Sequence, residues 1–248
     1  MKRILIFIAT LLVVLAPLSG CKKITIININ SSPEDGSGSG SGSGDGSGSG
    51  DGSGSGSGTS DKPGDGVTPV PDAIDLGVVY NGKNVKWASF NLGASSPEQF
   101  GLYMTWGQID ENDYHHYSFP LGSSVTLPEE RDAASVKLGG KWRMPVKEEL
   151  DALLDQCNVE WDWIGTVRGA KVTSKKEGNT NSIFLPLGGY KNGVNHYNLN
   201  TYGSYWCSTI DRENYPDAYY VWFSLEYGRK VTSGNCSDSQ MIRPVMND

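Results

Sequence analysis

The stretch Leu138-Gly-Gly-Lys-Trp-Arg-Met-Pro-Val-Lys-Glu-Glu-Leu150 decides the fold, because a helix with one clearly apolar face begins inside it. Pro145 suits the first turn of a helix, because backbone N–H groups there have no hydrogen-bond partner within the helix and proline has no N–H. Glu148 and Glu149 then occupy the first turn, where the helix dipole favours negative charge. The apolar residues that follow have the i, i+3, i+4, i+7 spacing of a buried helix face: Leu150, Leu153, Leu154 and Cys157.

A second helix is predicted just upstream of this stretch. Pro128 fits its first turn, with Glu129 and Glu130 beside it, and Gly139 fits its end. Both helices are short, so they must pack against other elements to be stable.

Strand-like segments separated by turn residues fill most of the remaining chain from residue 72 onward. Asn81-Gly82 is a strong hairpin signal between the segments 74–80 and 85–91, because both turn positions require positive φ. Further strands are predicted at 169–174, 181–186, 205–210 and 218–225, and 240–245 is expected to close the sheet. The sequence therefore predicts an α+β domain with mostly antiparallel short strands and two helices.

Several of these segments resemble, in order along the chain, the signatures of the Fibrobacter succinogenes major paralogous domain, which is found in lipoproteins of Bacteroidetes. They include Val85-Lys-Trp-Ala-Ser-Phe-Asn-Leu-Gly-Ala94, the Trp-Arg-Met-Pro segment, Gly203-Ser-Tyr-Trp-Cys-Ser-Thr209 and Ile242-Arg-Pro-Val245. The resemblance implies a C-type-lectin-like fold, from the branch related to the formylglycine-generating, sulfatase-modifying enzymes. It also implies a structural role for the motif residues Trp142, Arg143, Pro145, Glu149 and Arg243.

The chain departs from the active members of these families. The reactive cysteine pair of formylglycine-generating enzymes is not visible, and neither are the Glu-Pro-Asn, Gln-Pro-Asp or Trp-Asn-Asp triplets of lectin calcium sites. Phe90 stands where family members often have cysteine. We therefore expect no catalytic residues, no metal and no cofactor. Cys207 and Cys236 are expected to pair as a disulfide, and Cys157 is expected to be a core residue on the apolar helix face.

The first twenty residues have the pattern of a secretory signal. Lys2 and Arg3 precede the apolar run 4–16, which is too short to span a bilayer. Leu18-Ser19-Gly20-Cys21 resembles the bacterial lipobox, which predicts a signal peptide over 1–20 and lipidation of Cys21; an ordinary signal peptide with a chance cysteine is the alternative. Lys22 replaces the aspartate that often retains lipoproteins in the inner membrane. The expected location is therefore the outer membrane, at the cell surface, with the periplasmic face as an alternative.

Residues 21–71 are predicted to be a flexible tether between the lipidated N-terminus and the domain 72–248. Gly and Ser alternate from Gly36 to Gly58, and such a segment has no apolar surface to offset the entropy lost on ordering. The domain, in contrast, holds 24 of the 25 Phe, Trp and Tyr residues. Removal of Lys2 and Arg3 leaves 19 Lys+Arg against 28 Asp+Glu, a formal charge of −9. This acidic balance argues against a nucleic-acid partner.

Aromatic residues in two loops are the candidate ligand-binding residues: Tyr114, His115, Tyr117, Tyr197 and Tyr202. Trp161 and Trp163 share one face of a predicted strand, and core packing is their expected use, with a ligand platform as the alternative. The predicted function is an envelope lipoprotein that displays a lectin-like domain for a glycan or protein ligand. A formylglycine-generating-type oxidoreductase and a structural subunit of a surface assembly are the alternatives.

Overall fold

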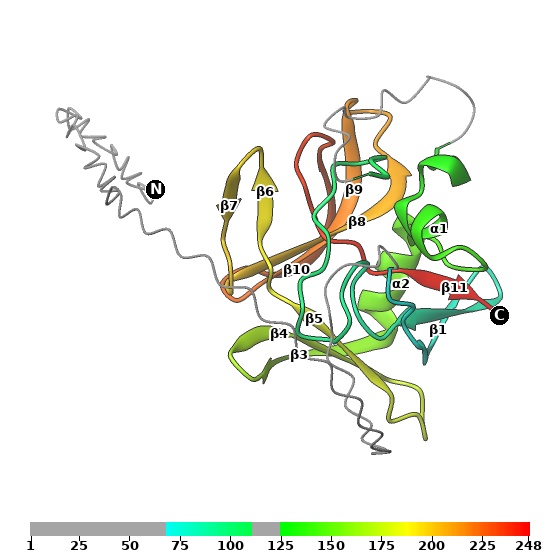
Figure 1. Ribbon diagram of the computed structural model, residues 1–248. Helices are drawn as coiled ribbons and strands as arrows, with labels where there is room; N and C mark the ends of the chain where they lie inside the picture. The colour runs from blue at the N-terminus through cyan, green and yellow to red at the C-terminus, as the bar shows by residue number, and fades with distance from the viewer. Residues whose placement is uncertain (1–67, 111–124) are drawn as a thin grey trace, which may run out of the picture. The chain divides into compact units, whose positions relative to one another are not determined.

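The computed structural model describes residues 68–110 and 125–248 (Figure 1). All described residues belong to one compact unit, which lies within Asp61–Asp248. Cys21, the Gly/Ser segment and the candidate loop with Tyr114, His115 and Tyr117 lie outside the described residues.

The expected architecture of short antiparallel strands with two α-helices is confirmed for the described part of the chain. Asn81 and Gly82 have φ of 48° and 72°, as the predicted hairpin turn requires, and every paired strand within the sheets runs antiparallel. The first sheet has the order β1-β2-β11, formed by β1 (Ala73–Tyr80), β2 (Lys83–Ala88) and β11 (Val245–Asn247).

Two further three-stranded sheets and a small hairpin complete the strands. One sheet has the order β3-β4-β5, with β3 (Cys157–Ile164), β4 (Val167–Ser174) and β5 (Ser182–Pro186). The other has the order β10-β9-β8, with β8 (Tyr202–Ile210), β9 (Asp217–Ser224) and β10 (Gly228–Asn235). The hairpin consists of β6 (Tyr190–Asn192) and β7 (Asn195–Tyr197).

The helices differ from prediction at their ends. The helix expected from Pro128 is interrupted at Asp132, whose extended backbone separates the 3₁₀ turn η1 (Glu129–Arg131) from α1 (Ala133–Leu138). The helix α2 (Lys147–Gln156) ends one residue before Cys157, which begins β3 and is fully buried there. Of the helices in the described ranges, none is long and apolar enough to cross a membrane.

The core consists of two apolar clusters that meet at β8. Consecutive side chains of a strand point to opposite faces, so Trp206 packs in one cluster and Cys207 in the other. The cluster around Cys207 includes Leu150 and Leu153 of α2, whereas the cluster around Trp206 includes Cys236.

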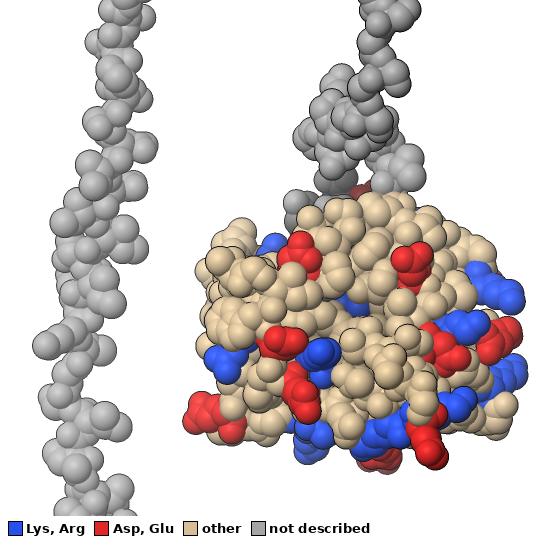
Figure 2. Space-filling model, turned by 90° about the horizontal axis from the view of Figure 1, so that it is seen from below, with Lys and Arg blue, Asp and Glu red and all other residues tan. Residues whose placement is uncertain are grey.

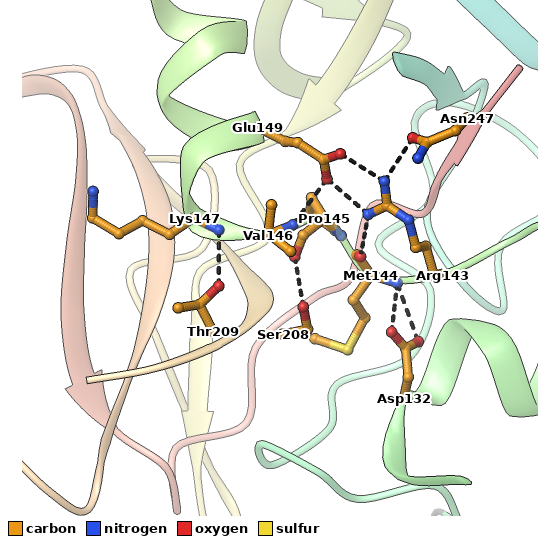
Figure 3. A network of polar contacts seen from close by, with 10 residues as sticks. All are labelled: Asp132, Arg143, Met144, Pro145, Val146, Lys147, Glu149, Ser208, Thr209 and Asn247. Carbon is orange, nitrogen blue, oxygen red and sulfur yellow. Dashed lines mark hydrogen bonds and ion pairs between the residues drawn. The ribbon is translucent and has the colours of Figure 1, made fainter. Parts of the chain in front are cut away.

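The motif residue Arg143 joins α2 to the C-terminal strand (Figure 3). Its guanidinium donates to both carboxylate oxygens of Glu149 at 2.7 and 2.6 Å and to Asn247 Oδ1 at 2.7 Å. Glu149 is 2% exposed and also accepts from the backbone N–H of Val146 at 2.9 Å, so it caps the start of α2. Asp132 binds the other side of this segment, where its carboxylate accepts from Met144 N at 2.9 Å.

The second motif arginine, Arg243, is 1% exposed and contacts no carboxylate among the described residues. It donates to Asn91 Oδ1, to Ala88 O and to Phe184 O at 2.9, 2.8 and 2.6 Å. These oxygens come from the end of β2, the loop after it and β5, so the arginine links two sheets. Burial lowers the pKa of Arg243 to about 10, which leaves it charged at neutral pH.

Candidate binding site

The β6–β7 hairpin is fixed against the β8–β9–β10 sheet (Figure 1). Gly189 N donates to Tyr202 O at 2.6 Å, and Lys191 and Ser239 exchange two backbone hydrogen bonds of 2.8 Å. Gly189 has φ of 66°, and a Cβ at this position would lie 1.9 Å from Tyr197 O. Only glycine fits this close approach, so the sequence determines where the hairpin sits.

Aromatic rings continue from the hairpin onto the sheet. Tyr190 stacks on Tyr197 across the hairpin, with ring centroids 5.3 Å apart. It also meets Tyr202 at an interplanar angle of 71° and a centroid distance of 6.2 Å. Tyr202 in turn stacks on Trp222 at 6.0 Å. The rings of Tyr190 and Tyr202 therefore form two walls that meet at a steep angle.

These two walls enclose a cavity of about 300 Å³, which we call the tyrosine cavity. Gln240 lies in its lining and is 3% exposed, and its backbone is held by two hydrogen bonds of 3.1 Å with Met104. The side-chain Oε1 of Gln240 is buried and has no hydrogen-bond partner among the described residues. The cavity is lined by Tyr190, Asn198, Tyr202, Ser204, Tyr220, Asp238 and Gln240.

An unmet buried acceptor costs about 1–3 kcal/mol in a folded protein. Oε1 is closed to water, so the Gln240 side chain must turn toward the tyrosine cavity before a ligand hydroxyl or amide can donate to it. A ligand that gains this hydrogen bond would recover part of the free energy of the unmet acceptor.

The hydroxyls of Tyr202 and Tyr220 are neutral at physiological pH. Burial raises the pKa of Tyr202 and that of Tyr220, and the nearby charge of Asp238 adds to both shifts. The Tyr202 and Tyr220 hydroxyls are hydrogen-bonded to each other. Asp238 is oriented by Asn192, whose Nδ2 donates to Oδ1 of the carboxylate at 2.7 Å.

A second cavity of about 410 Å³ lies next to the first, because Tyr202 and Asn198 line both. One further lining residue, Thr201, directly precedes β8, and the others come from the end of β9 and the turn that follows it: Ser224, Leu225, Glu226 and Tyr227. Tyr202 is thus the wall shared by two adjoining cavities.

The structure brings Tyr197 and Tyr202 together in this region, as two of the five candidate ligand-binding residues. Tyr202 lines the cavities directly, and Tyr197 is 41% exposed and supports Tyr190 from the outer side of the hairpin. The remaining lining residues are not among the sequence candidates. The alternation along β9, which puts Tyr220 and Trp222 on one face, is the signal that could have identified this sheet surface.

The tryptophans of β3 do not pack in the core as expected. Trp161 is 38% exposed and Trp163 is 55% exposed. Opposite them on β4 lie Ala170 and Arg168, and the Arg168 guanidinium is 5.4 Å from the centre of the Trp163 ring. The end of this hairpin extends beyond the apolar cluster, so nothing in the described chain covers the two indole rings fully.

The expected Cys207–Cys236 disulfide is not formed. Both cysteines are free and buried, and they belong to the two different apolar clusters on either side of β8. The Cys207 thiol donates instead to Tyr219 O at 3.1 Å. Burial raises the pKa of each of these thiols to about 12 and that of Cys157 to about 11.

Within residues 68–110 and 125–248, no group of three or more His, Cys, Asp or Glu side chains is arranged to hold a metal ion. Comparison with known protein families, curated proteins and solved structures gives no match. The tyrosine cavity is therefore interpreted from its own geometry.

Proposed function

We propose that the protein binds a glycan through the tyrosine cavity of a C-type-lectin-like domain of the major paralogous type. The observation that carries the proposal is a cavity walled by Tyr190 and Tyr202, whose lining includes Gln240. The Oε1 of Gln240 is buried and has no hydrogen-bond partner among the described residues. Binding cavities commonly combine aromatic walls with a few fixed polar groups that orient the ligand.

A sugar ring matches this combination well. Its C–H faces are apolar and can lie on the flat tyrosine rings, and its hydroxyls can form hydrogen bonds with the polar groups of Gln240 and Tyr220. Ser204 and Asn198 add neutral hydrogen-bonding groups to the lining. An apolar ligand would leave these groups unpaired, so the lining favours a ligand with many hydroxyls.

We also propose that the domain is held at the outer membrane, facing the cell surface, by lipid on Cys21. Two or more acyl chains hold a protein on a membrane durably, since each buried methylene contributes about 0.8 kcal/mol. A Gly-rich coil of roughly 40 residues has a root-mean-square span of about 35 Å. Such a tether would let the domain search for ligands near the membrane at a raised effective concentration.

The free and buried thiols of Cys207 and Cys236 do not favour the oxidoreductase alternative. A reactive cysteine needs an accessible thiolate, and burial acts in the opposite direction by raising the pKa of both thiols.

The proposal is tested by glycan-array binding of the full-length protein in detergent, with and without calcium. Gln240→Leu replaces the polar amide with an apolar side chain of similar size. It should abolish binding without loss of stability. Trp163→Ala, which removes an exposed aromatic ring outside the cavity, is the matched control and should bind as the wild type does. Binding that survives in Gln240→Leu would place the glycan elsewhere, and an array with no glycan bound would reject the function.

A further inference from the structure

The two adjoining cavities have negative charges and no positive ones in their lining. Asp238 lines the tyrosine cavity and Glu226 lines its neighbour. Among the described residues that line either cavity, there is no Lys or Arg. Lys191 directs its ammonium away to the Tyr103 ring, 4.4 Å from the centroid, and Lys230 pairs with Trp222 on the sheet without lining a cavity.

The two charges lie on either side of one aromatic wall. Tyr202 and Asn198 are common to both cavities, so a ligand that extends from one to the other must pass Tyr202. A single sugar would occupy one cavity and meet one carboxylate. A linear chain of two or more sugars would meet both.

We infer that the paired cavities select a linear glycan whose sugars carry protonated amino groups. This inference rests on the proposed glycan binding and adds the charge of the ligand. A cation beside a tyrosine face is attracted by the negative centre of the ring, and a carboxylate held in place nearby adds a Coulomb attraction. The same carboxylates repel glycans that carry carboxylate or sulfate groups, which gives selectivity by repulsion as well as by attraction.

Asp238 is the better placed of the two carboxylates for this role. Asn192 fixes one of its oxygens through the 2.7 Å hydrogen bond, and the other oxygen has no hydrogen bond to a described residue. The carboxylate is therefore held in position before a ligand arrives, which reduces the entropy lost on binding.

The test compares three trisaccharides in calorimetric titrations of the full-length protein in detergent: glucosamine, N-acetylglucosamine and galacturonic acid trimers. The buffer is acidic enough to protonate the amines but leaves aspartate ionised. The glucosamine trimer should bind about five- to tenfold more tightly than the neutral trimer, and the galacturonate trimer most weakly. The preference should shrink as salt is added, because the charges are near solvent.

Asp238→Asn separates this inference from general attraction to an acidic protein. Asparagine can still accept from Asn192, so the cavity keeps its shape while its charge is removed. The preference for the glucosamine trimer should fall to about twofold or less while the neutral trimer binds as before. Glu160→Gln on β3 changes the net charge equally, far along the chain from the cavities, and should retain the full preference.

Equal binding of the charged and neutral trimers by the wild type would overturn the inference and leave glycan binding intact. A preference for the glucosamine trimer that persists in Asp238→Asn would also overturn the inference, because another part of the surface would then bind the charged amino groups. If none of the three trimers binds and the array is also empty, the proposed function itself fails.

Discussion

Glu149 has a negative charge in an environment that is almost closed to water. Arg143 is its only ion-pair partner within the described ranges, and the arginine side chain is itself 28% exposed. Removing one member of a buried pair leaves the other charged and unmatched, which costs more than the pair contributes to stability. Water can reach the space that Arg143 would vacate, and this limits the penalty.

Arg143→Ala should therefore lower the free energy of unfolding by about 2–4 kcal/mol, measured by chemical denaturation. Lys147→Ala is the control on the same helix. Its partly exposed pair with Asp151 spans one helical turn, and its ammonium lies 5.4 Å from the centre of the Tyr219 ring. Together these contacts should contribute no more than about 1 kcal/mol. Equal losses in the two variants would show that Glu149 does not need its arginine.

The three buried thiols give a second prediction at the scale of single residues. Burial raises the pKa of each above its ordinary value near 9, to about 11 for Cys157 and about 12 for Cys207 and Cys236. A thiol pKa that is higher in the folded state means that the protonated thiols contribute to the free energy of unfolding, and this contribution is complete below pH 9. It is then lost as pH rises from 9 towards 12.

A thiol reagent at neutral pH should therefore react with none of these cysteines in the folded protein and with all three after denaturation. Absorbance of the thiolate released by the reagent, followed over time, gives the number of reactive cysteines in the folded protein and in the denatured protein. A fast reaction in the native protein that disappears in Cys207→Ser or Cys236→Ser would favour the oxidoreductase alternative over a binding protein.

At the scale of elements, the position of the β6–β7 hairpin depends on one glycine. Gly189→Ala would put a methyl group against Tyr197 O and force a residue with a side chain into positive φ. We expect a loss of about 2–4 kcal/mol, concentrated in the hairpin, together with loss of glycan binding. Hydrogen exchange of the Lys191 and Ser239 amides measures the local effect.

Gly193→Ala provides the comparison within the same hairpin. Its φ is 56°, but nothing lies within 4 Å of the added methyl group. The cost should be about 1 kcal/mol from backbone conformation alone, and binding should persist. Similar exchange rates in the two variants would mean that the contact between Gly189 and Tyr197 does not hold the hairpin.

The tryptophans Trp163 of β3 and Trp206 of β8 lie in opposite environments. Trp163 is exposed, whereas Trp206 is fully buried and donates from Nε1 to Met104 O at 3.0 Å. Trp163→Ala should change stability by less than about 1 kcal/mol, and Trp206→Ala should cost about 3–5 kcal/mol. Thermal unfolding followed by circular dichroism would measure both, and a large loss from Trp163→Ala would indicate an additional contact.

The elements that local sequence could predict are those set by local chemistry. The Asn81-Gly82 turn has backbone angles that few other residue pairs adopt, and the apolar face of α2 repeats within one helix. Asp132 was missed as a helix break because its carboxylate is held partly by Met144 N, twelve residues away. The end of α2 was misplaced because Cys157 is equally suited to a buried helix face and to the first position of a buried strand.

For the candidate site too, local sequence identifies some residues, and others depend on contacts between distant segments. Tyr197 and Tyr202 lie in one aromatic segment, so composition alone was enough to select them. Gln240 and Asp238 follow β10, and they reach the tyrosines only because the backbone of Ser239 pairs with Lys191 of the hairpin. That pairing joins segments about fifty residues apart and has no local signature.

For the whole molecule, surface charge and attachment to the membrane determine which ligands the domain can reach and bind. The formal net charge is −7, and acidic and basic side chains are interspersed over the face shown in Figure 2 rather than gathered by sign. The surface drawn there therefore has no broad field to attract a polymer of either charge. Selection by charge would have to occur within a cavity, at fixed carboxylates such as Asp238.

The attachment proposed at Cys21 yields the last prediction. In the native host, the wild type should incorporate labelled fatty acid and should have lost residues 1–20, because lipid transfer to the Cys21 thiol precedes cleavage after Gly20. Cys21→Ser has no thiol to accept the lipid, so it should carry no label and keep its signal segment. Mass spectrometry of the N-terminal peptide and autoradiography measure the two effects.

Deletion of 36–58 is the control, because it shortens the tether without touching the lipid site. That variant should be labelled and cleaved like the wild type, yet should capture less of a glycan fixed to an opposing surface, since its reach is shorter. A wild type that is cleaved but unlabelled would reveal an ordinary signal peptide with a chance cysteine. The domain would then be released rather than held, and the tether could not raise its concentration at the membrane.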